Sequence, residues 1–95
     1  MSHDHISVGQ RVLDIEARAV DALKDSLDTS FSAACDLMLN AKGRVIVTGM
    51  GKSGHVGSKL AATLASTGTP SFFVHPGEAS HGDLGMITPD DVVLA

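Results

Sequence analysis

The sequence predicts an α/β protein whose parallel sheet is preceded by two helices. Three observations support this prediction. A β-branched apolar run at 45–48 leads into a glycine-rich turn and an alanine-rich helical stretch, a second apolar run follows at 71–74, and two amphipathic stretches precede both. Because a strand, helix and strand in succession join parallel strands by a right-handed crossover almost without exception, we expect a βαβ unit. At 95 residues the chain has room for one small domain.

Residues 1–42 are predicted to be a helical lead-in. Apolar residues recur at helical spacing from about Ser7 to Leu27, so we expect a long amphipathic helix that packs on another subunit or on its own sheet. Its apolar face is marked by Val8, Val12, Ile15, Ala19 and Leu23. Good N-cap residues at 28–30 begin a second helix, and Lys42-Gly43 offers a cation and a C-terminal glycine for its end.

Residues 43–95 are predicted to hold the βαβ unit and a third strand. Val45–Thr48 carries apolar residues in succession, as expected for a strand covered on both faces. The crossover helix is expected from His55 to about Ser66, with Gly68 as its C-cap. The second strand is Ser71–Val74.

The third predicted strand is Val92–Leu94, and the chain stops directly after it at Ala95. A strand that ends without a turn, a cap or a polar tail suggests a chain cut from something longer. We therefore expect these 95 residues to be truncated.

Composition excludes several classes of function. A net charge of −4 and seven dispersed Lys and Arg residues argue against sequence-independent nucleic-acid binding, and the three aromatic residues are too few for a stacking platform. No apolar run approaches the roughly 20 residues of a membrane span, and the first residues lack the basic start of a signal peptide, so we expect a cytoplasmic protein. The single Cys35 is expected to be a small core residue.

The glycine-rich segment 49–55, Gly-Met-Gly-Lys-Ser-Gly-His, partly matches three known loops. Its Gly-x-Gly-x-x-Gly spacing fits the dinucleotide fingerprint, but His75 stands where an acid would hold the ribose, and Glu78 is displaced into the loop. A nucleotide-triphosphate loop needs a glycine at the position of Ile46, and a serine-hydrolase elbow needs one at His55. The first match is therefore disfavoured and the other two fail.

A mononucleotide or sugar-phosphate cradle remains as the interpretation of this segment. Gly51 lets the backbone approach an anion closely, the Ser53 hydroxyl can donate a hydrogen bond, and Lys52 adds a mobile positive charge. The alternative is a tight strand-to-helix turn whose lysine is merely solvated.

The polar segment 75–85 is expected to face the glycine-rich segment, because loops that follow parallel strands lie at the same edge of a sheet. The chemistry-bearing side chains that this brings together are Lys52, His75, Glu78, Ser80, His81 and Asp83. Two imidazoles and a carboxylate can transfer protons near neutral pH, whereas their spacing matches no standard zinc pattern. In the alternative interpretation they satisfy one another or cap the loop.

An anion cradle that faces acid and base groups suits proton transfer on a phosphorylated substrate. Aldose–ketose isomerisation is one such reaction: a base removes the proton next to the carbonyl, a proton moves between the two oxygens, and a cation stabilises the enediolate. Each positioned acid or base typically accelerates such a step by about 10²–10⁴-fold.

Segments 49–55 and 65–86 closely resemble the sugar isomerase (SIS) domain of the bacterial arabinose 5-phosphate isomerases. The resemblance runs from about Ile15 to Ala95 and is most specific between residues 44 and 94, so the chain is interpreted as the N-terminal part of one such domain. It implies a flavodoxin-like three-layer sandwich that assembles as a homotetramer and uses no organic cofactor. The implied reaction interconverts D-ribulose 5-phosphate and D-arabinose 5-phosphate on the route to the Kdo sugar of lipopolysaccharide.

The resemblance also implies roles for individual residues. Lys52 is implied to be catalytic, and our prediction adds His81 and Glu78 as acid and base groups, with Gly51 and Ser53 in substrate binding. His75 and His81 are implied to approach the substrate, and His75 can take an inhibitory or incidental zinc. The pair Gly68-Thr69 is implied in substrate contact, although it enters the second strand from the other edge, so we expect it to serve a neighbouring subunit.

Relatives of this type continue past the third strand into a Ser/Thr-rich loop that grips the phosphate and carries a further catalytic acid. Two other functions stay open at the level of sequence. One is a non-catalytic regulatory module that binds a sugar phosphate, and the other is an interaction fragment held by its long first helix.

Overall fold

The computed structural model describes residues 4–79 and 82–95. The chain divides into two compact units, Met1–Ala33 and Ala34–Ala95. Among the described residues, no helix has the length and apolar character needed to cross a membrane.

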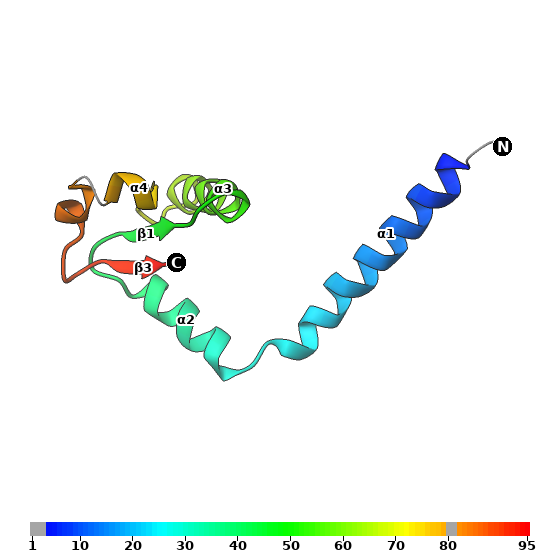
Figure 1. Cartoon of the computed structure of the whole chain (residues 1–95). Helices are drawn as coiled ribbons and strands as arrows, with labels where there is room; N and C mark the ends of the chain where they lie inside the picture. Colours follow the sequence, from blue (N-terminus) through cyan, green and yellow to red (C-terminus); the bar gives the residue numbers. More distant parts are fainter. Residues whose placement is uncertain (1–3, 80–81) are drawn as a thin grey trace. The chain divides into compact units, whose positions relative to one another are not determined.

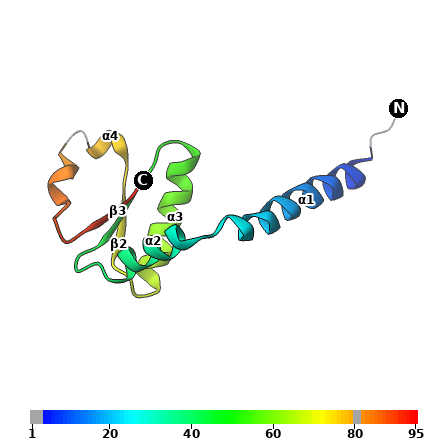
Figure 2. The same cartoon turned by 90° about the horizontal axis from the view of Figure 1, so that it is seen from below.

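The first unit contains α1, His5–Ala22, which continues into a 3-10 turn at Leu23–Ser26 (Figure 2). This confirms the predicted long helix, which begins at His5 because the Asp4 carboxylate accepts a hydrogen bond from the Ser7 amide at 3.0 Å. Every residue of α1 is exposed, including its large apolar side chains. The described residues of the first unit therefore leave the predicted apolar face uncovered.

The second helix, α2, spans Thr29–Leu39 and crosses from the first unit into the second. The Asp28 carboxylate accepts hydrogen bonds from the Ser30 amide and hydroxyl, which confirms the predicted N-cap. Cys35 is exposed rather than in the core, so that prediction is wrong, because the helix buries none of its residues in this chain.

The second unit is a parallel three-stranded sheet with flanking helices, as predicted (Figure 1). Its strands are β1 (Val45–Thr48), β2 (Ser71–Val74) and β3 (Val92–Leu94), in the order β2-β1-β3. In register, Val45 lies opposite Ser71 on one side and Val92 on the other. This order is the beginning of the flavodoxin-like order 2-1-3-4-5.

The core of this unit is centred on β1. Val45, Ile46 and Val47 are 0%, 1% and 3% exposed, and successive strand residues point to opposite faces, so both faces of β1 are covered. The helix α3, Lys52–Ser66, packs on β1 and β2 and contributes Ala61 to the core. Met38 of α2 packs against the same cluster.

In the described part of the connection from β2 to β3 there are two short helical segments, where the sequence predicted a polar loop. They are α4, Pro76–Ala79, and a 3-10 turn at Asp83–Met86. α4 begins directly after His75, whose carbonyl accepts a hydrogen bond from the Ala79 amide at 3.0 Å. Single helical turns of this kind depend on local hydrogen bonds, which hydrophobic periodicity does not reveal.

Asp91 organises the start of β3. Its carboxylate accepts hydrogen bonds from the Arg44 amide at 2.6 Å and the Thr88 amide at 2.7 Å, and its side chain is 2% exposed. The Arg44 guanidinium donates to the Met86 carbonyl at 2.9 Å and lies 4.6 Å from the centre of the Phe72 ring. These contacts tie the connection before β3 to the starts of β1 and β2.

Gly43 belongs to this junction and not to the end of α2. The prediction that it caps α2 is wrong, because α2 ends at Leu39. The Gly43 amide donates to the Asp90 carbonyl at 2.9 Å, and a Cβ at this position would collide with the Asp91 carboxylate. A glycine is needed here for the close approach of two chain segments.

Candidate functional site

The glycine-rich segment turns the chain from β1 into α3 within a few residues. Gly51 precedes α3 with φ 63° and ψ −130°, a backbone conformation that residues with a side chain rarely adopt. The helix therefore begins at Lys52, and the prediction that it begins at His55 placed its start too late. This puts Lys52 and Ser53 in the first turn of α3, where helix geometry leaves amide groups without intrahelical acceptors.

Gly54 and Gly57 have a different role, since both lie inside α3 and are buried. A Cβ at Gly54 would lie 2.7 Å from the Gly49 carbonyl oxygen, and one at Gly57 would lie 3.1 Å from a Val47 methyl carbon and 3.3 Å from the Phe73 ring. These glycines let α3 approach the glycine turn and the sheet closely. The position of the helix is thereby fixed by backbone contact.

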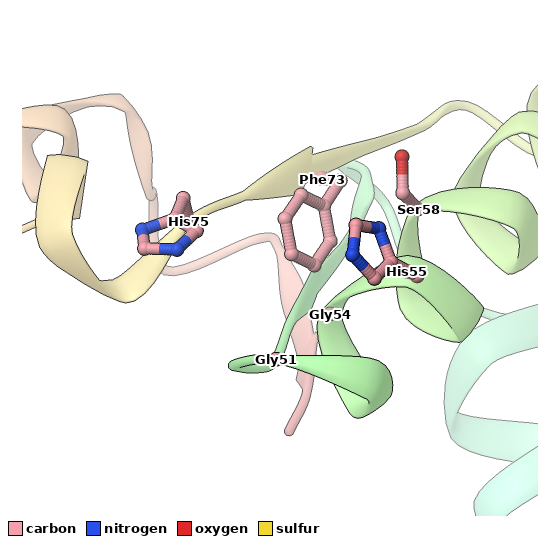
Figure 3. A pocket seen from close by; sticks show the side chains of 6 residues that line it. All are labelled: Gly51, Gly54, His55, Ser58, Phe73 and His75. Carbon is pink, nitrogen blue, oxygen red and sulfur yellow. The ribbon is translucent and has the colours of Figure 1, made fainter.

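A pocket of about 300 Å³ opens beside this turn (Figure 3). Its six lining residues come from α3, from the turn before it and from the end of β2: Gly51, Gly54, His55, Ser58, Phe73 and His75. Figure 3 shows the Phe73 ring between the imidazoles of His55 and His75. The predicted meeting of the two loops is thus observed for His75.

Three residues of this pocket were not predicted from the sequence: His55, Ser58 and Phe73. A helix advances about 100° per residue, so His55 and Ser58 each lie one step round from a buried glycine, at Gly54 and Gly57. The signal was the pair of glycines three residues apart, which marks the buried stripe of α3 and places the next residues at its border. Lys52 and Ser53 are exposed and are not among the six lining residues.

The hydrogen-bond partner of His75 determines which ring nitrogen carries its proton. Nδ1 accepts a hydrogen bond from the Gly77 amide at 3.0 Å, so Nδ1 is unprotonated and the neutral ring carries its proton on Nε2. His75 is exposed and offers this N–H as a donor.

The same geometry bears on the predicted zinc at His75. Histidines that bind metals usually donate their other ring N–H to an acceptor, whereas here the other nitrogen accepts. Within residues 4–79 and 82–95, no group of three or more His, Cys, Asp or Glu side chains could hold a metal ion. The described residues therefore provide no such ligand group around His75, and an incidental zinc there stays a prediction.

The other predicted site residues lie on α4, outside the described residues, or at the opposite edge of the sheet. Glu78 lies on α4 and is exposed, while His81 and Ser80 lie outside the described residues. Gly68, with φ 101°, follows the end of α3, and the Thr69 amide donates to the Leu64 carbonyl at 2.9 Å. This pair precedes β2 at the amino edge of the sheet, whereas the pocket lies at the carboxyl edge. Gly68 and Thr69 are therefore separated from the pocket of their own chain.

A family model described as the SIS domain matches residues 37–95. The chain belongs to this family. The matched range covers the whole sheet, the glycine turn and every residue of the pocket.

Curated relatives agree with this membership. The chain is 66% identical over 92 residues to an arabinose 5-phosphate isomerase, KdsD, of Pseudomonas aeruginosa, and 59% identical to KdsD of Escherichia coli K12. Each alignment covers 97% of this chain and 28% of the relative. The chain thus spans little more than a quarter of the length of the curated relatives that it matches.

Solved structures share the fold. A protein of E. coli CFT073, c3406, solved in complex with arabinose 5-phosphate, superposes with a TM-score of 0.83 at 44% identity, covering 96% of this chain and 50% of that one. A Bacteroides fragilis protein that has been proposed to be a phosphosugar isomerase involved in capsule formation gives a TM-score of 0.86 at 37% identity, covering 95% of this chain and 48% of that one.

Proposed function

We propose that this SIS domain chain is part of an isomerase that interconverts D-ribulose 5-phosphate and D-arabinose 5-phosphate. The observation that carries the proposal is the 66% identity to an arabinose 5-phosphate isomerase across 97% of the chain, a span that includes the glycine turn and the pocket. The structural similarity to a protein solved with arabinose 5-phosphate supports the same substrate class.

The proposed reaction needs groups that move protons and a cation that stabilises an enediolate. Lys52, exposed at the first turn of α3, is proposed as the cation, and Glu78 and His81 as acid and base groups. The Nε2–H of His75 is proposed to donate to a substrate oxygen, because Gly77 holds the ring in that tautomer. The reaction moves protons without net oxidation, so we propose that it needs no organic cofactor.

Binding of the substrate is proposed to involve the backbone of Gly51 and the Ser53 hydroxyl, where the first turn of α3 presents amide groups to an anion. Gly68 and Thr69 are proposed to serve the site of a neighbouring subunit, since they lie at the other edge of their own sheet. This requires a homo-oligomer, proposed to be a tetramer. A cytoplasmic location is proposed from the sequence, which has a single cysteine and no long apolar run.

The test is the rate of interconversion of the two sugar phosphates by the whole protein, before and after Lys52→Ala. We expect the rate to fall by about 10²-fold or more, the usual consequence of removing a preorganised charge from a transition state. Lys59→Ala is the matched control, because Lys59 is exposed on the same helix and donates to the Thr63 hydroxyl at 3.3 Å, outside the pocket.

Two results would count against this assignment. Unchanged turnover in Lys52→Ala would remove that residue from the mechanism. Saturable binding of the sugar phosphate by the unmodified protein without interconversion would favour a regulatory module over an isomerase.

A further inference from the structure

We propose that His55 contacts the hydroxyl groups of the bound sugar, across the pocket from His75, and so helps to select the substrate. This inference rests on the proposed function, because it concerns the same ligand. It assigns a binding role to the last residue of the glycine-rich segment, for which the sequence predicted no function.

The position of His55 is fixed by the packing of α3. The helix is held against the sheet by Gly54 and Gly57, and the residue after the first of these can only lie at the border of the buried stripe. That border faces Phe73 and the end of β2, where the pocket opens. The imidazole therefore reaches the pocket from a helix, and side chains on helices are positioned more precisely than side chains on loops.

The His55 ring is exposed and available to a ligand. Within the described part of the chain, no hydrogen bond or ion pair engages its side chain, whereas Nδ1 of His75 is already occupied by the Gly77 amide. A neutral imidazole offers one donor and one acceptor, which is the pair of functions that a sugar hydroxyl requires. Ser58, one turn further along α3, adds a hydroxyl to the same wall.

The composition of the pocket favours the hydroxylated part of the ligand over its phosphate. Among the residues that the structure describes, its lining consists of glycines, two imidazoles, one hydroxyl and one aromatic ring, with neither Lys nor Arg. A phosphate dianion binds preferentially where cations or several amide groups converge, as at the first turn of α3 with Lys52 and Ser53, and not on the wall formed by His55, Ser58 and Phe73. The Phe73 ring, between the two imidazoles, instead offers a flat apolar surface to the C–H bonds of a sugar.

The inference is tested by titrating the whole protein with arabinose 5-phosphate and, separately, with inorganic phosphate. We expect His55→Ala to raise the Kd for arabinose 5-phosphate by about 5- to 10-fold, as for the loss of a hydrogen bond, and to leave the Kd for phosphate unchanged. Val56→Ala is the matched control: Val56 is the next residue of α3, 69% exposed and not part of the pocket, and both affinities should stay the same.

A second measurement does not depend on how the variant folds. Imidazole resonances of the unmodified protein are followed by NMR, and arabinose 5-phosphate should shift those of His55 and His75 while inorganic phosphate leaves His55 unshifted. An unshifted His55 signal at saturating sugar phosphate would overturn the inference, and so would an equal loss of affinity for both probes. If the unmodified protein binds no sugar phosphate, the proposed function fails first and this inference falls with it.

Discussion

At the scale of single residues, the glycines of segment 49–57 have separate tasks that their spacing does not distinguish. Gly51 makes the turn through its positive φ, whereas Gly54 and Gly57 sit in regular helix and permit close packing. The spacing of Gly49, Gly51 and Gly54 indicated a single loop, and for that reason the predicted start of α3 at His55 was too late. The spacing of the glycines shows where they cluster in the sequence. Only the neighbouring atoms show at which of these positions an added side chain would disrupt the packing.

This difference predicts the effect of Gly54→Ala. The added methyl group would lie 2.7 Å from the Gly49 carbonyl oxygen, a backbone atom that cannot move without displacing the turn. We expect the free energy of unfolding to fall by about 1–3 kcal/mol, as for other overpacked sites, measured by urea denaturation.

Gly9→Ala is the control for this substitution. Gly9 lies inside α1, and a Cβ there would meet no atom within 4 Å. We expect this change to favour the helix by about 0.5–1 kcal/mol, because alanine loses less backbone entropy. Equal effects of the two substitutions would contradict the role given to Gly54.

At the scale of secondary-structure elements, the strands were predicted more accurately than the connections. The predicted bounds of β1, β2 and β3 are confirmed, because runs of buried apolar residues define strands directly. α4 and the junction at Gly43 depend on individual hydrogen bonds between residues far apart or in single turns. A pattern of hydropathy carries no information about such bonds.

The junction before β3 predicts a dependence of stability on pH. Hydrogen bonds, first from the Arg44 amide and then from the Thr88 amide, hold the pKa of Asp91 below its ordinary value of 3.8. The folded state therefore binds this proton less readily than the unfolded chain. The stabilisation from Asp91 is present above about pH 4 and is lost as the pH falls through the lower, folded pKa.

Asp91→Asn tests this expectation. The side chain of Asn has one acceptor oxygen, whereas the two carboxylate oxygens of Asp91 accept separately from the Arg44 and Thr88 amides. We therefore expect lower stability at pH 7 and a weaker loss of stability between pH 5 and pH 2, measured by urea denaturation. Asp90→Asn is the control, since the Asp90 carbonyl and not its carboxylate bonds the Gly43 amide. An unchanged pH profile in Asp91→Asn would show that other carboxylates cause the acid response.

At the scale of the whole molecule, the candidate site could be predicted only in part. The sequence located the glycine turn and His75, because both follow strands at the same sheet edge. It did not locate His55 and Ser58, because their position depends on how closely α3 packs.

The proposed homo-oligomer leads to a prediction about α1. Its apolar face carries Val8 and Val12, which are 61% and 51% exposed, and Ile15, which is 51% exposed. A continuous apolar face of this kind is typical of a contact surface, and the proposed partner is a second copy of the chain. We expect the protein to sediment as an oligomer and Val12→Lys to lower its mass at a given concentration.

Gln10→Lys separates the loss of the apolar face from the added charge. Gln10 lies about 160° from Val12 around α1, so the same positive charge is added on the opposite side of the helix. We expect this variant to sediment like the unmodified protein. If both lysine variants dissociate equally, charge repulsion and not the apolar face controls assembly. If the unmodified protein is monomeric at every concentration, α1 does not join subunits, and the proposed sharing of Gly68 and Thr69 with a neighbouring site fails as well.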